Sequence, residues 1–312
     1  MDAAPPHAGA RLPAGVLGAA FVLLWCTGYP AARIALNHCA PFTLLVLRFG
    51  GAGLVFAALA LTARIRLPRG AQLLHSAGVG VLSLALQFGC VYFAAARGVN
   101  VGLIALVVGT MPIVTALFGL AVGEPVRPLQ WLGFVVGFAG VALAVGESIR
   151  LDSSAGTAAY VAVLGSLIAV SGGTLYQKRL GSEVDVRAGL TVQQLVAMLV
   201  LLPLAWHEGL QHDHTRTFYL AVAWLIGVNS VAAFALFFLL LRRGAVNQVA
   251  ALFFLMPPVT ALLDYVVLGD PFTAYQVGGI VLAALGVFIA TRAPRLSVPP
   301  AAVPRSSPAP GE

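Results

Sequence analysis

The sequence predicts an all-α integral membrane protein of ten transmembrane helices, built as two inverted five-helix repeats. Its composition points to a membrane, since 60% of the 312 residues are hydrophobic and only 9% are charged. A soluble domain carries about 25% charged residues, and in water this chain would expose large apolar patches. The other two observations are the long apolar runs along the chain and the recurrence of first-half segments in the second half.

The apolar runs have the length that a bilayer requires, which is about 20 residues for a helix. Ten segments fit: 16–36, 42–62, 73–95, 101–122, 128–146, 157–177, 188–206, 217–241, 246–268 and 273–291. Glycine and proline punctuate the short connections between them. We therefore divide the chain into an N-terminal tail (1–15), a first repeat (16–146), a second repeat (157–291) and a disordered tail rich in proline, alanine and serine (292–312).

The basic residues predict the orientation, because cytoplasmic loops are enriched in lysine and arginine. A cytoplasmic N-terminus places most of them inside, including Arg64, Arg66, Lys178 and Arg242. Both termini are then cytoplasmic, in what we expect to be a bacterial inner membrane. The same residues lie in short gaps between apolar runs and form no continuous basic face. A nucleic-acid-binding function is therefore excluded.

An internal repeat relates the two halves. Residues 111–117 read MPIVTAL and residues 256–262 read MPPVTAL, at an offset of 145. Downstream, the turn 123–125 (Gly-Glu-Pro) matches 269–271 (Gly-Asp-Pro). The repeat unit contains five helices, an odd number, so the second copy enters the membrane from the opposite side. Such inverted repeats are typical of transporters that bind solute between their halves.

The two Gly-acid-Pro turns predict tight corners between consecutive helices. We expect the glycine to end one helix in the left-handed conformation. We expect the acid to cap the next helix and the proline to occupy its first turn.

Taken together, these features resemble the drug/metabolite transporter superfamily, and specifically its EamA-type ten-helix members. The resemblance covers about residues 16–291. It is carried by the paired Met-Pro segments and turns and by three further segments, Trp25-Cys26-Thr27-Gly28-Tyr29, Leu47-Arg48-Phe49 and Tyr176-Gln177-Lys178-Arg179. It implies ten helices, cytoplasmic termini and, in many members, export of amino acids or other small metabolites. The fold alone does not name a substrate.

The paired prolines predict the solute site. Pro112 lies inside the fourth apolar run, and Pro257 and Pro258 lie inside the ninth. Proline interrupts a helix, and matching breaks in two inverted halves indicate where a solute binds. The alternative is a plain packing kink. Met111 and Met256 flank the breaks and suit an adaptable apolar wall.

Two threonines lie one helical turn beyond the breaks, Thr115 and Thr260. Each is expected to hydrogen-bond to its own helix. A hydrogen bond to the solute is the alternative.

Arg48 and Asp264 are the charged residues deepest within the apolar runs. At about 1.5 Å per residue they lie at similar depth from the outer surface. Because a charge within the bilayer is costly, we expect the two to pair or to contact a zwitterionic solute together. The alternatives are that each side chain extends separately to the outer headgroups, or that Arg33 is the partner of Asp264. The family resemblance does not extend to Asp264.

Further polar and aromatic residues occur in the middle of apolar runs and suit a small-solute site. Holding helices together is the alternative role of each. The candidates for solute contact are Trp25, Thr27, Tyr29, Gln87, Tyr92, Tyr176 and Asn229. Stripes of small residues predict close helix packing or a homodimer face. They comprise Gly133, Gly137, Gly140, Gly279, Ala283 and Gly286.

The preferred function is secondary transport of a small-molecule solute across the lipid bilayer, with a channel or passive facilitator as the alternative. We find no GxSxG, HExxH or Walker A motif, so no catalytic residue, cofactor or nucleotide-driven step is predicted. Residues 207–216 contain three histidines, which we interpret as part of a solvated outer loop. No metal site is predicted there.

Overall fold

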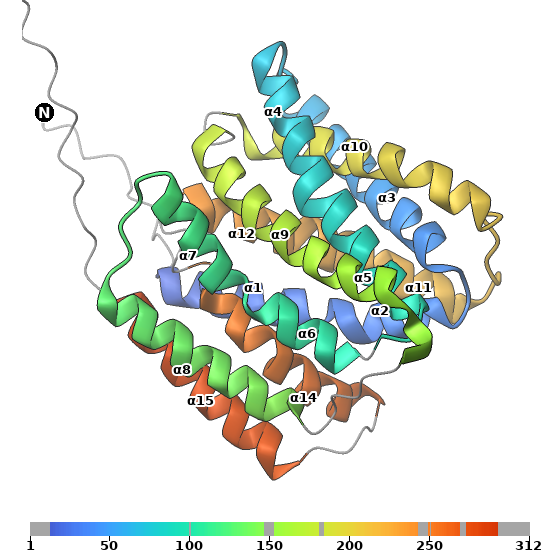
Figure 1. Ribbon diagram of the computed structural model, residues 1–312. Coiled ribbons are helices and arrows are strands. Elements are labelled where there is room, and N and C mark those ends of the chain that lie inside the picture. Colours follow the sequence, from blue (N-terminus) through green and yellow to red (C-terminus); the bar gives the residue numbers. More distant parts are fainter. Residues whose placement is uncertain are drawn as a thin grey trace, which may run out of the picture.

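The structure, a computed structural model, is mainly helical in the part of the chain that it describes. It describes residues 13–99, 101–146, 153–180, 184–242, 249, 251–268 and 273–292. The predicted tails therefore lie almost entirely outside the described residues. Figure 1 shows long helices packed side by side as one bundle.

The first half runs from α1 to α8. Its elements are α1 (Ala14–Cys26), α2 (Gly28–Leu36), α3 (Pro41–Thr62), α4 (Ala71–Val79), the π-helix η1 (Gly80–Leu86), α5 (Gln87–Ala96), α6 (Val101–Gly109), α7 (Met111–Ala121) and α8 (Pro128–Val145).

The second half runs from η3 to α15. Its elements are the 3₁₀ turn η3 (Ser153–Ala155), α9 (Thr157–Leu180), α10 (Val186–His207), α11 (Arg216–Trp224), the π-helix η4 (Leu225–Ala233), α12 (Phe234–Arg242), the 3₁₀ turn η5 (Leu252–Leu255), α14 (Met256–Leu268) and α15 (Ala274–Arg292).

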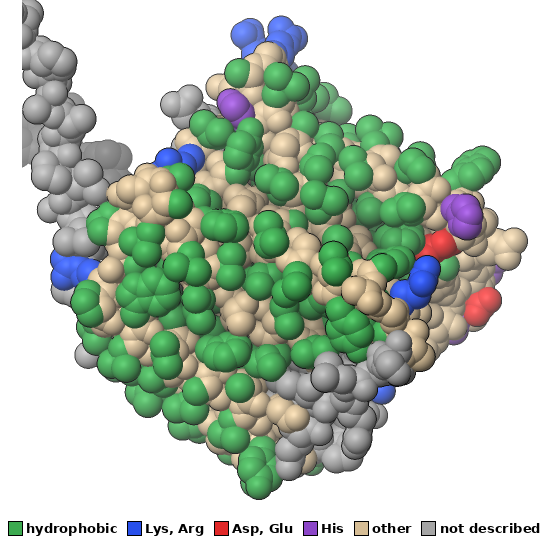
Figure 2. Space-filling view, viewed as in Figure 1, with side chains coloured by type: hydrophobic (Ala, Val, Ile, Leu, Met, Phe, Trp, Pro, Cys, Tyr) green, Lys and Arg blue, Asp and Glu red, His purple; other side chains and the backbone are tan. Residues whose placement is uncertain are grey.

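Among the described residues, eight helical segments are long and apolar enough to cross a membrane. Two shorter apolar helices, Pro128–Ala144 and Leu252–Val267, lie within the two remaining predicted ranges. Large hydrophobic side chains cover the bundle, among them Leu61, Leu74 and Trp206, each more than 70% exposed. Figure 2 shows such side chains over most of the visible face, with the charged groups near its edges. The protein is therefore an integral membrane protein.

Backbone irregularities recur at equivalent places in the two halves. The π-helix η1 begins at Gly80 and η4 begins at Leu225, which is 145 residues later. The helix also restarts at Met111 in the first half and at Met256 in the second. Pro112 accordingly lies in the first turn of α7, where its missing N–H costs nothing. The breaks thus precede the prolines and do not lie at them.

Helices of the two halves interleave in the bundle. Helix α3 packs along α10, and α8 packs along α15. Helix α7 lies against α9, and its counterpart α14 lies against α1. The fourth helical segment of each half therefore packs on the first segment of the other half, and the site-forming residues come from both.

The small-residue stripes face each other inside a single chain. A Cβ atom added to Gly140 would overlap the backbone N of Ala283, and one added to Gly286 would overlap the backbone N of Gly137. The backbones of α8 and α15 (Figure 1) thus approach as closely as glycine permits. These faces are covered within the chain. A homodimer through them, one of the roles expected above, would require α8 and α15 to separate.

The turn between α7 and α8 differs partly from the prediction. Gly123 has φ 82° and adopts the left-handed conformation as expected. However, α8 begins at Pro128, and its N-cap Arg127 donates its backbone N–H to Oε1 of Gln130 (3.0 Å). The capping role expected for Glu124 and the first-turn role expected for Pro125 are therefore wrong. The matching residues 269–271 lie outside the described residues.

Glu124 instead joins this turn to the end of α9. Its carboxylate accepts a hydrogen bond from Nζ of Lys178 (2.7 Å) and lies 3.6 Å from Nε of Arg179. The Arg179 guanidinium also donates to the Val122 carbonyl (2.7 Å). Charged pairs of this kind are stronger than neutral hydrogen bonds, so they fix one end of α7 to α9.

A second carboxylate ties α3 to α10 at one end of the bundle. Oε2 of Glu208, at the C-terminus of α10, accepts hydrogen bonds from the backbone N–H groups of Phe42 (2.9 Å) and Thr43 (3.0 Å). These donors are unsatisfied by the helix itself, and the positive end of the helix dipole favours a carboxylate there.

Replacing Gly140 by leucine should destabilise the protein, because the added side chain cannot fit against Ala283. We expect the free energy of unfolding to fall by about 1–3 kcal/mol, the usual cost of overpacking. Thermal unfolding in detergent should then show a lower midpoint. Gly146→Leu is the matched control, since a Cβ at Gly146 meets nothing within 4 Å. Equal midpoints for the two variants would contradict this account of the α8–α15 contact.

Candidate functional site

A buried arginine forms the centre of the candidate site. Arg48 lies on α3, and its side chain is 2% exposed. Its Nε donates to Oγ of Ser230 (2.7 Å), and its Nη2 donates to Oδ1 of Asn229. A buried charge is costly unless it is hydrogen-bonded or paired. The two acceptors therefore hold the guanidinium group inside the bundle.

Both acceptors belong to the π-helix η4. The Asn229 amide also donates through Nδ2 to the Trp25 carbonyl of α1 (2.8 Å). A Cβ atom at Gly28 would lie 2.5 Å from Cγ of Asn229. Gly28 therefore permits the close approach of η4 to the start of α2. π-Helical turns are frequent at functional sites, and here one connects α1, α2 and α3.

Aromatic rings cover the Arg48 guanidinium group. Its Cζ lies 4.6 Å from the ring centroid of Phe88 and 5.5 Å from that of Phe49. Such cation–π contacts are worth about 2 kcal/mol or more when desolvated. Tyr92 is buried in the same hydrophobic cluster as Phe49 and Phe88. The site is thus a positive charge in a largely aromatic enclosure.

No described carboxylate forms an ion pair with Arg48. The side chain of Asp264, its expected partner, lies outside the described residues, and so does that of Pro257. The alternative in which Arg48 extends to the headgroups is wrong, because the guanidinium group is buried in the bundle. Ser230, Phe49 and Phe88 were not predicted as site residues, because an ordinary serine and phenylalanine within an apolar run give no distinguishing signal.

Several predicted residues are buried in one hydrophobic core of the bundle. Trp25 is 7% exposed and packs on Phe234, with ring centroids 4.8 Å apart. Met111 and Met256 are buried in the same hydrophobic cluster as Trp25 and Tyr92. The methionines from the two halves therefore lie in one hydrophobic core.

The two equivalent threonines do not behave as expected. Thr115 is 1% exposed, and its Oγ1 has no hydrogen-bond partner among the described residues; Oγ1 of Thr260 is likewise buried and unpaired there. The expected hydrogen bonds to their own helices are absent from the described structure. Thr110, by contrast, does bond to its own helix, through the Val107 carbonyl (2.6 Å).

The remaining predicted residues have separate surroundings. Tyr176 bonds through its hydroxyl to Nδ1 of His75 (2.7 Å), and Oγ1 of Thr27 accepts a hydrogen bond from Nε1 of Trp224 (3.1 Å). Gln87 is buried at the start of α5. Pro112 and Pro258 are buried, and Tyr29 is 42% exposed. No hydrogen bond or ring contact in the described structure brings any of these residues to the guanidinium group.

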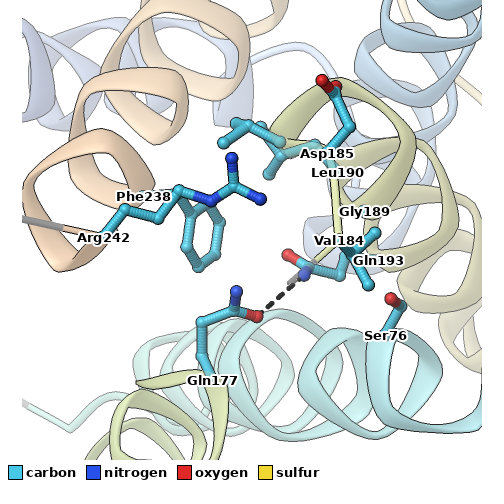
Figure 3. A pocket seen from close by; sticks show the side chains of 10 residues that line it. Ser76, Gln177, Val184, Asp185, Gly189, Leu190, Gln193, Phe238 and Arg242 are labelled. Carbon is cyan, nitrogen blue, oxygen red and sulfur yellow. Dashed lines mark hydrogen bonds between the residues drawn. The ribbon is translucent and has the colours of Figure 1, made fainter. Parts of the chain in front are cut away.

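A cavity near one end of the bundle lies between α4, α9, α10 and α12 (Figure 3). Its polar lining includes Ser76, Gln177, Gln193, Arg242 and Asp185. The sequence analysis missed this cavity. One signal could have revealed it, because Gln193 follows Arg48 by 145 residues and so occupies the equivalent place in the second half.

Asp185, at the edge of this cavity, caps α10. Its Oδ1 accepts hydrogen bonds from the backbone N–H of Arg187 (2.9 Å) and from its Nε (3.2 Å). Partial burial opposes ionisation of the carboxyl group. The hydrogen bonds and charge of Arg187 outweigh that effect and lower the pKa of Asp185, so the group is anionic at neutral pH.

Comparison with known proteins gives a consistent family. The profile of the EamA-like transporter family matches residues 13–146 and again residues 157–292. The chain is 28% identical over 290 residues to the uncharacterized inner membrane transporter YedA of Escherichia coli strain K12, covering 88% of this chain and 92% of that protein.

Two further similarities extend over most of the chain. A protein of Salmonella typhimurium named as a probable amino-acid metabolite efflux pump is 24% identical over 286 residues, covering 88% of this chain and 93% of that protein. One crystal structure matches with a TM-score of 0.74 and 22% identity, covering 90% of this chain and 97% of the other. This last likeness shows the fold alone.

Replacing Asn229 by alanine should destabilise the protein strongly, because it removes an acceptor from a buried charge. We expect the free energy of unfolding to fall by about 3–5 kcal/mol, the usual cost of leaving one member of a buried charged interaction without its partner. Thermal unfolding in detergent measures the effect. Asn37→Ala, at the exposed end of α2, is the control. A loss no larger than that of the control would show that Asn229 does not hold Arg48.

Proposed function

Because the chain belongs to the EamA-like transporter family, we propose that this membrane transporter is a secondary exporter of a small metabolite that carries a carboxylate, an amino acid or a related compound. The observation that carries the proposal is the buried Arg48 within an aromatic enclosure, with no carboxylate partner among the described residues.

The chemistry of the guanidinium group supports a carboxylate ligand. The group has five N–H donors in a planar fork that matches a carboxylate. The hydrogen bonds to Ser230 and Asn229 use Nε and Nη2 and leave other N–H donors of the guanidinium group for a ligand. An anionic group would also offset the buried positive charge. Thr115 and Thr260 offer unpaired hydroxyl groups for the remaining polar groups of the solute.

Alternating access between two inverted five-helix repeats is the mechanism that we propose. The matching π-helices and helix restarts of the two halves support structural equivalence. Equivalent halves of opposite orientation can exchange inward-open and outward-open arrangements around a shared site. The proposal includes ten transmembrane helices, both termini in the cytoplasm and insertion in the bacterial inner membrane. An inner membrane relative supports the last point.

The substrate class follows from the site together with one relative. A guanidinium group selects the carboxylate, and the apolar wall of Trp25, Met111 and Met256 accommodates a side chain. The relative named as a probable amino-acid metabolite efflux pump supports this class. The family and a relative named as a transporter support transport without chemical change.

Counterflow in proteoliposomes tests the proposal. We expect saturable exchange of at least one of a panel of labelled amino acids, and at least a tenfold loss, about 1.4 kcal/mol of binding, in Arg48→Gln. Arg97→Gln is the matched control, because Arg97 lies at the exposed end of α5 over Phe93. Non-saturable flux without counterflow would support the channel or passive facilitator instead. Unchanged exchange in Arg48→Gln would refute the carboxylate site.

A charge exchange tests whether Asp264 is the partner of Arg48, either directly or through a zwitterionic solute. Arg48→Glu should abolish exchange, and adding Asp264→Arg should partly restore it, since the opposite charges are again present at similar depth. Counterflow measures both variants, with Asp264→Arg alone as the control. A fully active Arg48→Glu variant would refute the pairing and any essential role of the positive charge.

A further inference from the structure

We propose that a hollow between the two halves binds the phosphate headgroup of an anionic membrane lipid. This arginine hollow is lined by Arg66, Arg69 and Gln72 of the first half and by Val184 and Asp185 of the second half. The proposal does not depend on which solute the protein moves. It assigns a role to a part of the molecule that the central site does not use.

The arginine hollow is large enough for a lipid headgroup. Its volume is about 380 Å³, and small-ligand pockets usually measure about 300–1,000 Å³. It lies at the surface, where the loop 63–70 connects α3 to α4. A phosphate group with the glycerol attached to it can therefore enter from outside the bundle.

Arg66 and Arg69 bring unpaired positive charge to the hollow. Both are exposed, and neither forms an ion pair in the described part of the chain. The carboxylate of Asp185 belongs to the same lining, but it already accepts hydrogen bonds from Nε (3.2 Å) and Nη2 (3.3 Å) of Arg187. Three guanidinium groups against one carboxylate leave the hollow positively charged. Guanidinium groups bind phosphate oxygens through paired, charge-assisted hydrogen bonds.

The backbone around the two arginines holds them at the hollow. Pro68 lies between them in the sequence, lines the hollow and is buried against the bundle. Gly70 directly precedes α4 and has φ 54°, a conformation that favours glycine. This turn leads directly into α4, which packs against α10. The arginines are thus carried by a loop that is anchored on both halves.

Exposed leucines adjoin the arginines. Leu67, in the lining itself, is 47% exposed, and Leu73 and Leu74 in the first turn of α4 are 42% and 72% exposed. Figure 2 shows basic side chains at the tip of the molecule where α4 begins, with hydrophobic side chains directly below them. A lipid matches both features, because its phosphate can bind the arginines while its acyl chains cover the leucines. A soluble phosphate compound would match the arginines alone.

The expected position in the membrane also favours an anionic lipid. The arginines belong to the end of the bundle that the distribution of basic residues assigns to the cytoplasm. The cytoplasmic leaflet carries anionic lipids, and basic pockets between transmembrane helices on this side bind phosphate-bearing headgroups. Because the lining comes from both halves, a bound lipid would strengthen the contact between them.

Native mass spectrometry of the full chain in detergent tests the site. The probes are phosphatidylglycerol and phosphatidylcholine with identical acyl chains, at equal concentration. We expect phosphatidylglycerol to bind at least about tenfold more tightly, because arginines near the headgroup attract an anionic lipid and not a zwitterionic one. It should also raise the midpoint of thermal unfolding more than phosphatidylcholine does. Glycerol 3-phosphate, which has no acyl chains, should not displace it at the same concentration.

Variants separate the arginine hollow from a general attraction to basic loops. Arg66→Gln and Arg69→Gln should each weaken phosphatidylglycerol binding about fivefold, and both together at least tenfold, while phosphatidylcholine binding stays the same. The double lysine variant should retain part of the preference, because the charge remains. Arg64→Gln is the matched control and should change binding less than twofold, since Arg64 is an exposed arginine of the same loop outside the lining.

Three results would overturn the proposal. The first is an unchanged preference for phosphatidylglycerol in the double glutamine variant, with thermal unfolding verifying that this variant is folded. The second is an equal loss in Arg64→Gln and Arg69→Gln, which would indicate general attraction to the loop. The third is displacement of the lipid by glycerol 3-phosphate, which would make the hollow a site for a soluble phosphate compound.

Discussion

The architecture depends on the solvation of one buried charge. Arg48 cannot be placed inside an apolar bundle unless protein groups replace water, and Asn229 and Ser230 of η4 do so. Asn229 also bonds to the Trp25 carbonyl, so this interaction connects α1, α3 and η4. Both acceptors are neutral, so within the described residues no carboxylate offsets the guanidinium group, which can therefore attract an anionic group into a membrane interior.

The π-helices and glycines follow from this constraint. A π-helical turn leaves backbone and side-chain positions that a regular α-helix lacks, and η4 uses them to present two adjacent acceptors to Arg48. Gly28 admits the Asn229 side chain, and Gly173 admits Ser83 of η1 in the other half. Both contacts place a glycine of one half against the π-helix of the other half, so they bind the two repeats together.

Different parts of the bundle are joined by different forces. The α8–α15 pair is held by backbone contact through small residues. Such contact provides van der Waals attraction and needs no polar side chains. The ends of α7 and α9 are joined by Glu124, Lys178 and Arg179 at the expected water boundary. An ion pair at a boundary can break in water more easily than a buried one, so the ends of these helices are better suited to separate than the α8–α15 pair.

The sequence by itself determined the membrane class, the apolar segments, the repeat and the place of Arg48 inside an apolar segment, because hydropathy and a repeated motif can be read directly from the chain. It also identified Trp25, Tyr92, Met111, Met256 and Asn229, which converge in the bundle. Only the tertiary structure decided that Ser230 and Phe88 hold Arg48 and that Glu124 pairs with Lys178 and does not cap α8. It also decided that the Thr115 hydroxyl has no hydrogen-bond partner among the described residues. These outcomes depend on which helices become neighbours, and interhelical contacts in an apolar bundle leave no periodic trace in the chain.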